Sequence, residues 1–363
     1  MPRLDRHIAN HVLGAMAVVL LVLGGLDLLF TAVDELGDTS GSYGSSAALQ
    51  YVAMTFPGHL YELLPMISLI GALVGLSLLA TGNELVIMQA AGISVARIVL
   101  AVMKPALLVM LGGVLLGEYA APVLELRAEL NKAVASGEQV GLSRYGHWER
   151  DGNAFLHFNA MQPDGALQGV SLLEFDGQQR IVRSVEAARA VHTGNSAPGR
   201  SVWTLEQGRE LGFVHTEDGS VTSTQHDFAS LPQTLDLTPD MLRVLIVDPD
   251  DMAMRDLWGH AGRFARQGQD ASAYYLAFWK KVLQPVTTAL LVLVAISFIF
   301  GPLRQATMGS RVFTAICFGL AFTILQRLMH NFALLYQLPP LLAILLPLLL
   351  TGLLGLHFFR RAA

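Results

Sequence analysis

Six apolar runs, each long enough to cross a membrane, restrict this sequence to very few folds. They lie near residues 11–33, 60–79, 98–120, 276–300, 312–335 and 340–359. A transmembrane helix needs roughly 20 apolar residues to cross about 30 Å of hydrocarbon. Only 15% of the residues are charged, against roughly a quarter in soluble domains. We therefore predict a membrane protein with six transmembrane helices, three on each side of a long polar insert.

Basic residues near the ends of these runs predict which side faces the cytoplasm. The short loops at 34–59 and 336–339 contain no Lys or Arg. The opposite ends of the runs carry Arg3, Arg6, Arg97, Lys104, Arg304, Arg311, Arg360 and Arg361. Because cytoplasmic loops are enriched in Lys and Arg, we expect both termini in the cytoplasm and the insert outside. No Ala-x-Ala-like cleavage site follows the long first run, so we expect a retained helix and not a signal peptide.

The insert has charges and turn residues spread evenly along it, which is typical of β structure. Candidate strands lie at 154–159, 169–176, 180–192, 201–207, 211–215 and 220–228. Candidate turns between them include Asp176-Gly177, Gly194-Asn195 and Asp218-Gly219. Many short strands at this spacing favour a sandwich, a jelly-roll or an open barrel. We predict helices 1–3 in residues 1–124, a jellyroll-like β domain with a return segment in 125–270, and helices 4–6 in 271–363.

A short segment at 80–94, between the second and third runs, carries helix signals at both ends. Thr81 followed by Glu84 matches a capping box, and Gly92 can end a helix in the left-handed conformation. These signals predict a cytoplasmic helix over 81–92.

Leu85, Met88 and Gly92 would share one face of this helix, with Glu84 beside them. Two interpretations stay open. An ordinary tight connector is common for a short helical loop. A coupling helix would instead bind a cytoplasmic partner through this face.

Ionisable residues inside the apolar runs cost about 2.5–3.5 kcal/mol each on insertion scales, so they are functional candidates. They are Asp27, Glu62, Glu118, Lys281 and Arg327. Glu62, Glu118 and Lys281 lie near the outer ends of their runs, where long side chains can reach the interface. Lys281, two residues after Trp279, fits an interfacial anchor.

Arg327 lies about two thirds of the way along the fifth run, with His330 one turn away on the same face. Its planar guanidinium suits phosphate, so it is a candidate contact for an anionic lipid headgroup. The alternative is an ion pair with Asp27 or Glu62, and the two are compatible if the pair opens when a ligand enters. Arg327, Lys281 and Asp27 are the candidate lipid-binding residues.

The sequence lacks the common catalytic and nucleotide-binding motifs. It has no Gly-x-x-x-x-Gly-Lys-[Ser/Thr] loop, no His-Glu-x-x-His pair and no Gly-x-Ser-x-Gly elbow, and Cys317 is its single cysteine. His7 and His11 are four residues apart, but zinc sites need three or four ligands, so we predict no metal site. The net charge of -5 argues neither for nor against nucleic acid. We expect no enzymatic activity, no cofactor and no nucleic-acid partner for this chain.

Several motifs in the membrane segments resemble those of lipopolysaccharide-export permeases of the LptF/LptG type. They are the run Glu84-Leu85-Val86-Ile87-Met88-Gln89-Ala90-Ala91-Gly92, the segments 117–122 and 297–304, Trp279-Lys280-Lys281 with Gln284-Pro285, and Met308-Gly309-x-Arg311. The similarity extends from Leu4 to the last run. Phe300-Gly301-Pro302-Leu303-Arg304 and Leu338-Pro339-Pro340 resemble the LptG-type subunit more than its LptF-type partner.

The resemblance implies a heterodimer with an LptF-type permease in the bacterial inner membrane. Two copies of a separate LptB-type ATPase would bind the ATP and Mg²⁺. A periplasmic β-jellyroll would pass lipopolysaccharide to LptC-type and LptA-type proteins. The helix at 81–91 would insert into a groove of the ATPase through Glu84, Leu85, Met88 and Gly92, with Glu84 contacting a basic residue there.

The sequence departs from this family at one place. LptG-type proteins commonly carry lysines just after the first span, where this chain has Asp34-Glu35-Leu36-Gly37-Asp38. Arg327 and Lys281 are the nearest substitutes for those headgroup contacts.

These features predict the permease subunit of an ATP-driven exporter that extracts lipopolysaccharide from the outer leaflet of the inner membrane. One alternative is an ATP-independent secondary transporter, for which Asp27 is the available mid-membrane centre. Another is a membrane scaffold whose periplasmic β domain binds a ligand.

Overall fold

The computed structural model divides the chain into two compact units. The described residues are 2–39, 43–136, 147–162, 165–197, 200–215, 221–235, 237–238, 247–266, 270–302 and 306–362. The helical unit comprises Met1–Gly37, Val52–Leu124 and Pro249–Ala363, and the sheet unit comprises Asp38–Tyr51 and Glu125–Asp248. The predicted turn at Asp218-Gly219, together with Leu303 and Arg304, lies outside the described residues.

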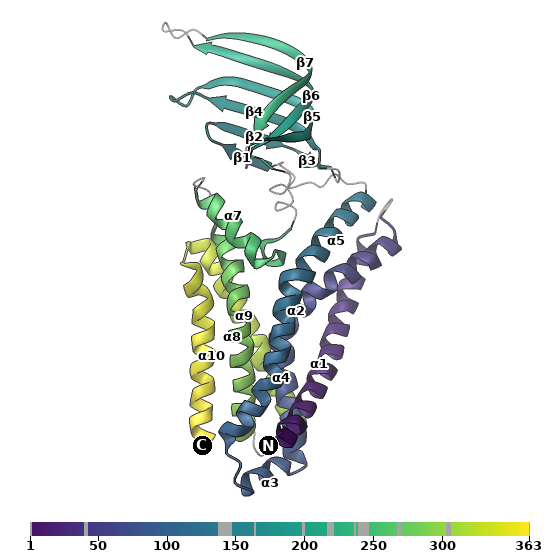
Figure 1. Ribbon diagram of the computed structural model, residues 1–363, viewed down its shortest axis with the longest axis vertical. Helices are drawn as coiled ribbons and strands as arrows, with labels where there is room; N and C mark the ends of the chain where they lie inside the picture. The colour runs from purple at the N-terminus through teal and green to yellow at the C-terminus, as the bar shows by residue number, and fades with distance from the viewer. Residues whose placement is uncertain are drawn as a thin grey trace. The chain divides into compact units, whose positions relative to one another are not determined.

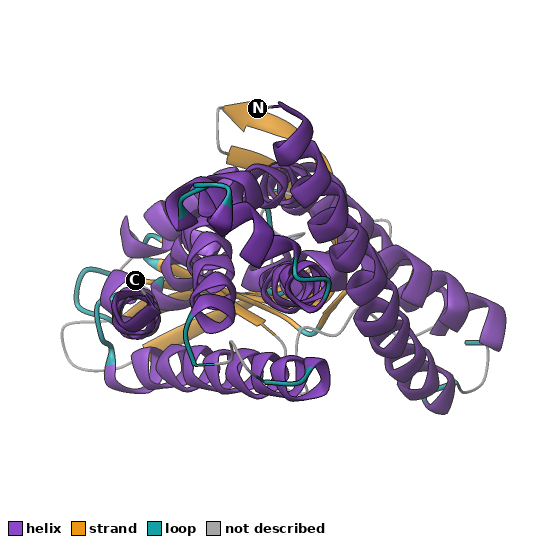
Figure 2. Cartoon of the chain, turned by 90° about the horizontal axis from the view of Figure 1, so that it is seen from below, coloured by secondary structure: helices purple, strands orange, loops and turns teal. Residues whose placement is uncertain are grey.

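Among the described residues, six helices are long and apolar enough to cross a membrane, which confirms the predicted number of spans. They are α1 (Pro2–Gly37), α2 (Ser45–Thr81), α4 (Val95–Leu115) with its continuation, α8 (Ser272–Phe300), α9 (Met308–Tyr336) and α10 (Pro340–Ala362). Figure 1 shows that α1 begins and α10 ends at the end of the helical unit that carries the short helix α3 (Glu84–Ala90). Figure 2, seen from that end, shows several of these helices nearly end-on.

The third span is longer than predicted. Helix α4 continues through a π-helical turn, η1 (Leu116–Ala120), into α5 (Ala121–Ser136). Residues 125–136 are therefore helical, although they group with the sheet unit. This segment combines charges with strong helix formers such as Ala, Leu and Glu, so its polarity resembles that of a globular insert while its propensity favours helix.

A second helix was not predicted. After the 3-10 turn η2 (Pro249–Asp251), helix α7 (Met254–Arg266) leads toward α8. Its buried residues Leu257, His260 and Ala261 recur at helical spacing. The return segment thus groups with the helices and not with the strands.

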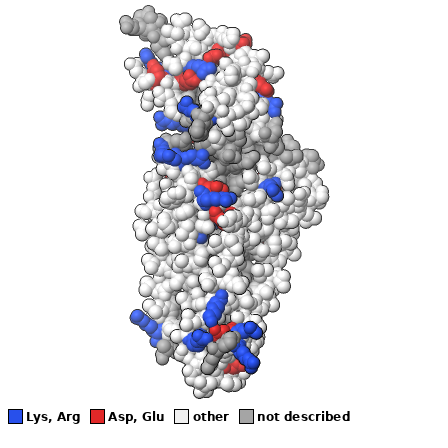
Figure 3. All heavy atoms as spheres, viewed as in Figure 1, with Lys and Arg blue, Asp and Glu red and all other residues white. Residues whose placement is uncertain are grey.

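The core of the helical unit lies around α2 and α8. In the most apolar window of α2, 61% of the residues are buried, against 17% for α9. A continuous apolar cluster contains residues of α1, α2, α3, α4, α8, α9 and α10, including Ile8, Leu73, Leu85 and Ile296. On the face drawn in Figure 3, Lys and Arg gather at the α3 end, and a broad band above it shows no charged side chains. An uncharged band of this kind is what a hydrocarbon layer requires.

Two glycines four residues apart allow α1 to approach α2 closely. A Cβ at Gly71 would lie 2.7 Å from the Cα of Met16, and one at Gly75 would lie 2.8 Å from the Cα of Val12. Small residues at this spacing let two helix backbones pack together within a membrane.

The sheet unit confirms the predicted all-β insert. Its strands are β1 (His147–Asp151), β2 (Ala154–Phe158), β3 (Ala160–Met161), β4 (Leu167–Phe175), β5 (Ile181–Ala197), β6 (Arg200–His215) and β7 (Val221–Leu235). They form one antiparallel sheet in the order β1-β2-β4-β5-β6-β7, with β3 paired to β4. Trp203 is fully buried in its core and donates its indole N–H to the carbonyl of Leu237 at 2.8 Å.

Strands β5 and β6 are longer than the sequence predicts. The predicted turn at Gly194-Asn195 lies inside β5, where the register with β6 shifts. The two strands predicted at 201–207 and 211–215 are one strand, because Gly208 marks a close crossing and not a turn. A Cβ there would lie 2.2 Å from the carbonyl oxygen of Glu186 on β5.

Candidate functional site

A cavity of about 650 Å³ lies within the helical unit, bounded by α1, α2, η2, α8, α9 and α10. Its polar lining consists of Asp27, His59, Tyr61, Glu62, Asp250, Lys280, Lys281, Gln284, Thr287, Thr323, Gln326, Arg327, His330 and Asn331. Its apolar lining consists of Leu63, Pro65, Met66, Leu291, Gly319, Leu320, Phe322, Ala343 and Ile344. The lining therefore suits a ligand with both charged and apolar parts.

Helices α8 and α9 each turn one face toward this cavity. The α8 face carries Lys280, Gln284, Thr287 and Leu291, and the α9 face carries Thr323, Gln326, Arg327 and His330. These positions recur at intervals of three and four residues, the spacing of one helix face. The α8 stripe can be read from the sequence, and it is the signal that would have identified Lys280 and Gln284.

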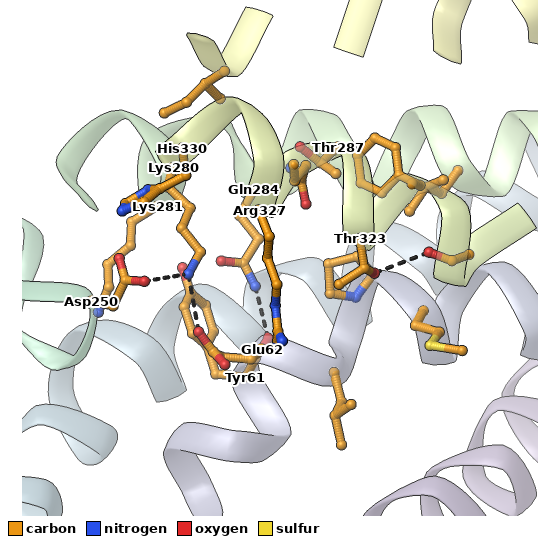
Figure 4. Close-up of a pocket in the computed structure, with 18 of the residues that line it drawn as sticks. Tyr61, Glu62, Asp250, Lys280, Lys281, Gln284, Thr287, Thr323, Arg327 and His330 are labelled. Atoms are coloured by element: carbon orange, nitrogen blue, oxygen red, sulfur yellow. Dashed lines mark hydrogen bonds and ion pairs between the residues drawn. The ribbon is translucent and has the colours of Figure 1, made fainter. Parts of the chain in front are cut away.

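Lys280 is the centre of an ionic network at the cavity wall. Its ammonium lies 3.0 Å from Oε1 of Glu62 and 2.8 Å from Oδ2 of Asp250. These contacts join α8 to α2 and to η2, as Figure 4 shows. Glu62 therefore pairs with Lys280 in this structure and not with Arg327, which was one of the alternatives left open by the sequence.

Lys281 is buried, with 4% of its surface exposed. Its ammonium donates to the carbonyl of Met252 at 2.6 Å and lies 5.5 Å from the ring centre of Tyr61. The interpretation of Lys281 as an anchor that reaches the interface is wrong, because the protein satisfies its charge internally. Its predicted role in lipid binding stays a prediction.

Asp27 and Arg327 do not pair with each other. Asp27 contacts His59 on α2, with Oδ2 and Nδ1 2.8 Å apart. Arg327 is exposed to the cavity, and within the described part of the chain no ion pair or hydrogen bond engages its guanidinium. Figure 4 shows Arg327 and Lys280 both extending toward the segment of α2 that carries Tyr61 and Glu62. The structure therefore leaves the guanidinium of Arg327 available to a ligand in the cavity.

The side chain of Glu118 caps helix α7. Its carboxylate lies in the π-helical turn η1 and accepts from the backbone N–H of Met254 at 2.7 Å and of Arg255 at 3.5 Å. These N–H groups lie in the first turn of α7 and have no carbonyl partner within the helix, and a negative charge at this end of a helix is stabilising. The interpretation of Glu118 as a snorkelling group stays a prediction.

Helix α3 begins differently from the prediction and ends as predicted. Thr81 belongs to α2 and donates its hydroxyl to the carbonyl of Ser77 at 2.8 Å, so the predicted capping box is wrong. Asn83, in the left-handed conformation with φ 59°, precedes the helix without a side-chain cap. At the other end Gly92 has φ +83°, and the N–H of Ile93 reaches the carbonyl of Met88, which forms a Schellman motif.

The face of α3 that was predicted to be apolar is turned toward the chain's own core. Leu85 and Met88 share one face and are 4% and 8% exposed. The apolar residues on the surface of α3 are Val86 and Ile87, at 52% and 64% exposed. Glu84 is partly exposed, and its Oε2 lies 2.6 Å from Nε2 of His7.

An ionic contact also joins α1 to α4 at the α3 end. The guanidinium of Arg97 donates to both oxygens of Asp5, at 3.1 and 3.2 Å, and Lys104 pairs with the same carboxylate. From the sequence, Arg97 and Lys104 indicated only which ends of the helices face the cytoplasm. Their spacing on one helix face would have suggested a shared partner.

Comparison with known proteins gives a consistent result along the whole chain. Residues 6–361 match the family described as lipopolysaccharide export system permease LptF/LptG. The lipopolysaccharide export system permease protein LptG of Escherichia coli (strain K12) is 34% identical over 346 residues, which cover 95% of this chain and 94% of that protein. The protein of the same name from Haemophilus influenzae is 32% identical over 351 residues, which cover 96% and 95% of the two chains.

Proposed function

Because this chain belongs to the lipopolysaccharide export system permease family LptF/LptG, we propose that it is the LptG-type permease subunit of an exporter that removes lipopolysaccharide from the outer leaflet of the inner membrane. The match over residues 6–361 carries this proposal. The chain is an integral membrane protein with six spans.

The cavity suits an amphiphile. Acyl chains would lie against the apolar part of the lining, and Arg327 would contact a phosphate of the headgroup. Lys281 is less suited to this role, because its ammonium already binds the carbonyl of Met252. Asp27, paired with His59, would shape the wall where α1 faces α2.

The motor would be a separate ATPase. The sequence has no nucleotide-binding loop, and α3 lies at the end rich in Lys and Arg, which we assign to the cytoplasm. Glu84, Val86 and Ile87 would form the surface that contacts the ATPase. Leu85 and Met88 would transmit its movement, because they connect α3 to the core around α2 and α8.

We propose further partners on the basis of the family. An LptF-type permease would complete the transmembrane part, two LptB-type subunits would supply ATP hydrolysis, and LptC-type and LptA-type proteins would receive the lipid from the β domain. The apolar residues exposed on α1 and α9, such as Leu21 at 72% and Phe313 at 69%, are available to lipid or to the second permease.

Photo-crosslinking tests the cavity. A crosslinking amino acid at Gln326, which lines the cavity beside Arg327, should capture lipopolysaccharide. Leu349 on α10, 64% exposed and outside the cavity lining, is the control position. Arg327→Ala should reduce capture about tenfold, and Arg327→Lys less, because hydrogen bonds to charged groups contribute about 1.5–3 kcal/mol. Capture at Leu349 without capture at Gln326 would contradict the proposal.

Coupling is tested in the reconstituted complex with its ATPase. Glu84→Ala should uncouple lipopolysaccharide release from ATP hydrolysis, while Gln89→Ala, on the same short helix, serves as the matched control. Release that needs no ATP would instead support a secondary transporter. Normal coupling in Glu84→Ala would remove α3 from the mechanism.

A further inference from the structure

Three side chains that could ligate a metal converge at the α3 end of the helical unit. His7 and His11 come from the first turns of α1, and Glu84 is the first residue of α3. One ligand atom of each lies within 4.8 Å of the others. The imidazole rings of His7 and His11 are 4.7 Å apart between centres, and Glu84 is hydrogen-bonded to His7 at 2.6 Å.

The packing around these side chains holds them in place. Ile8, adjacent to His7, is completely buried, and Leu85, adjacent to Glu84, is 4% exposed. Both belong to the same apolar cluster. The two helices that carry the three side chains are therefore positioned by core contacts that do not depend on the side chains themselves.

The chemistry of the set matches a borderline divalent cation. Two imidazoles at positions i and i+4 with one carboxylate form the three-protein-ligand arrangement that Zn²⁺ takes when a fourth position is left open. Bond lengths near 2 Å place tetrahedral ligands about 3.3 Å apart, so rotation of the side chains is enough to close the set. The hydrogen bond between His7 and Glu84 places one proton between the two side chains, and a cation can take the place of that proton.

We propose that His7, His11 and Glu84 bind one divalent transition-metal ion of the Zn²⁺ type, which would clip α1 to α3. From the sequence we predicted no metal site, because only two of the three ligands, His7 and His11, are close in sequence, and the third is 77 residues from His7. A bound cation would also occupy the carboxylate of Glu84. Because we propose that Glu84 contacts the ATPase, the bound cation would also affect coupling. This effect on coupling rests on the proposed function, whereas the metal site does not.

The test uses the full chain alone, untagged and chelator-treated, in lipid nanodiscs without any ATPase. Titration with Zn²⁺ by calorimetry, and with Co²⁺ by its visible absorption, should show one saturable equivalent and the intense bands of a tetrahedral site. His11→Gln leaves the hydrogen bond between His7 and Glu84 in place, yet it should weaken binding by about 100-fold, since even outer-shell partners of metal sites contribute 10- to 100-fold.

Two further variants make the result decisive. Glu84→Gln keeps a hydrogen-bonding group but loses the carboxylate, so it should weaken binding as well. His357→Gln changes an exposed histidine on α10 and should leave binding unchanged. Equal binding by the wild type and His11→Gln, or no saturable binding by the wild type, would overturn the proposal, and neither result would bear on lipopolysaccharide transport.

Discussion

The two ends of the helical unit both carry ion pairs, but the pairs have different surroundings. At the cavity end, Lys280 joins Glu62 to Asp250, and the neighbouring Lys281 is buried against a backbone carbonyl. At the α3 end, Asp5 holds two cations whose side chains are 42% and 60% exposed. The first set of contacts lies beside an internal cavity, and the second lies on the surface of a packed core.

This difference follows from what fills the space between the helices. At the α3 end, Ile8, Leu85 and Met88 fill that space with apolar contacts. At the cavity end, the helices enclose about 650 Å³ of space, so many dispersion contacts are lost. Ion pairs and hydrogen bonds between the helices there replace part of the lost apolar packing, and the space between the helices stays open to a ligand.

The largest expected effect is at the buried lysine. Lys281→Ala should lower the free energy of unfolding by about 3 kcal/mol, because it leaves the buried carbonyl of Met252 without a partner and removes a packed side chain. Thermal unfolding of the purified protein measures it. Lys280→Gln, at a half-exposed side chain, should cost about 1 kcal/mol. If Lys280→Gln lowered the free energy of unfolding more than Lys281→Ala, solvent exposure would not explain the difference between the two lysines.

An intermediate effect is expected at His260 on α7. Burial, and next the guanidinium of Arg263, lower the pKa of His260 to about 4. In the unfolded chain a histidine takes up its proton near pH 6.5, so the unfolded state binds more protons between pH 6.5 and 4. The free energy of unfolding should therefore fall by about 2 kcal/mol from pH 7 to pH 5, continue to fall toward pH 4, and be unaffected above this range.

The control for this pH dependence is His260→Gln, which cannot titrate. Its unfolding free energy should change less than that of the wild type between pH 6.5 and pH 4. An identical pH dependence in both proteins would assign the effect to other groups.

The smallest effect is expected at the α3 end. Asp5→Asn removes the contacts with Arg97 and Lys104, yet it should lower the free energy of unfolding less than either lysine substitution, because ion pairs with exposed cations contribute little to stability. The cost should shrink further in high salt. A loss as large as that of Lys281→Ala would show that ion pairs, and not apolar packing, hold the α3 end together.

Much of the architecture could be predicted from local properties of the chain. Hydropathy over about 20 residues predicts a span wherever it lies in the fold, so all six spans were found. Gly92 was predicted to end α3 because few other residues adopt its positive φ readily. The start of α3 was predicted wrongly because Thr81 is the last residue of α2 and therefore does not cap the next helix.

The polar pairs could not be predicted in the same way. Asp27 pairs with His59, 32 residues away, Glu84 with His7, 77 away, and Lys280 with Glu62, 218 away. Each side chain had several plausible partners in the sequence, and the candidate pairs with Arg327 were not the ones that formed.

Composition and periodicity thus establish how many helices cross the membrane, where the β insert lies and which faces are polar, because each of these depends on neighbouring residues in the chain. They leave open the depth and rotation of one helix against another. Those depend on fit along the whole contact, such as the approach of α1 to Gly71 and Gly75. The folded protein therefore determines which charges meet, where the cavity opens and that Glu84 lies beside two histidines.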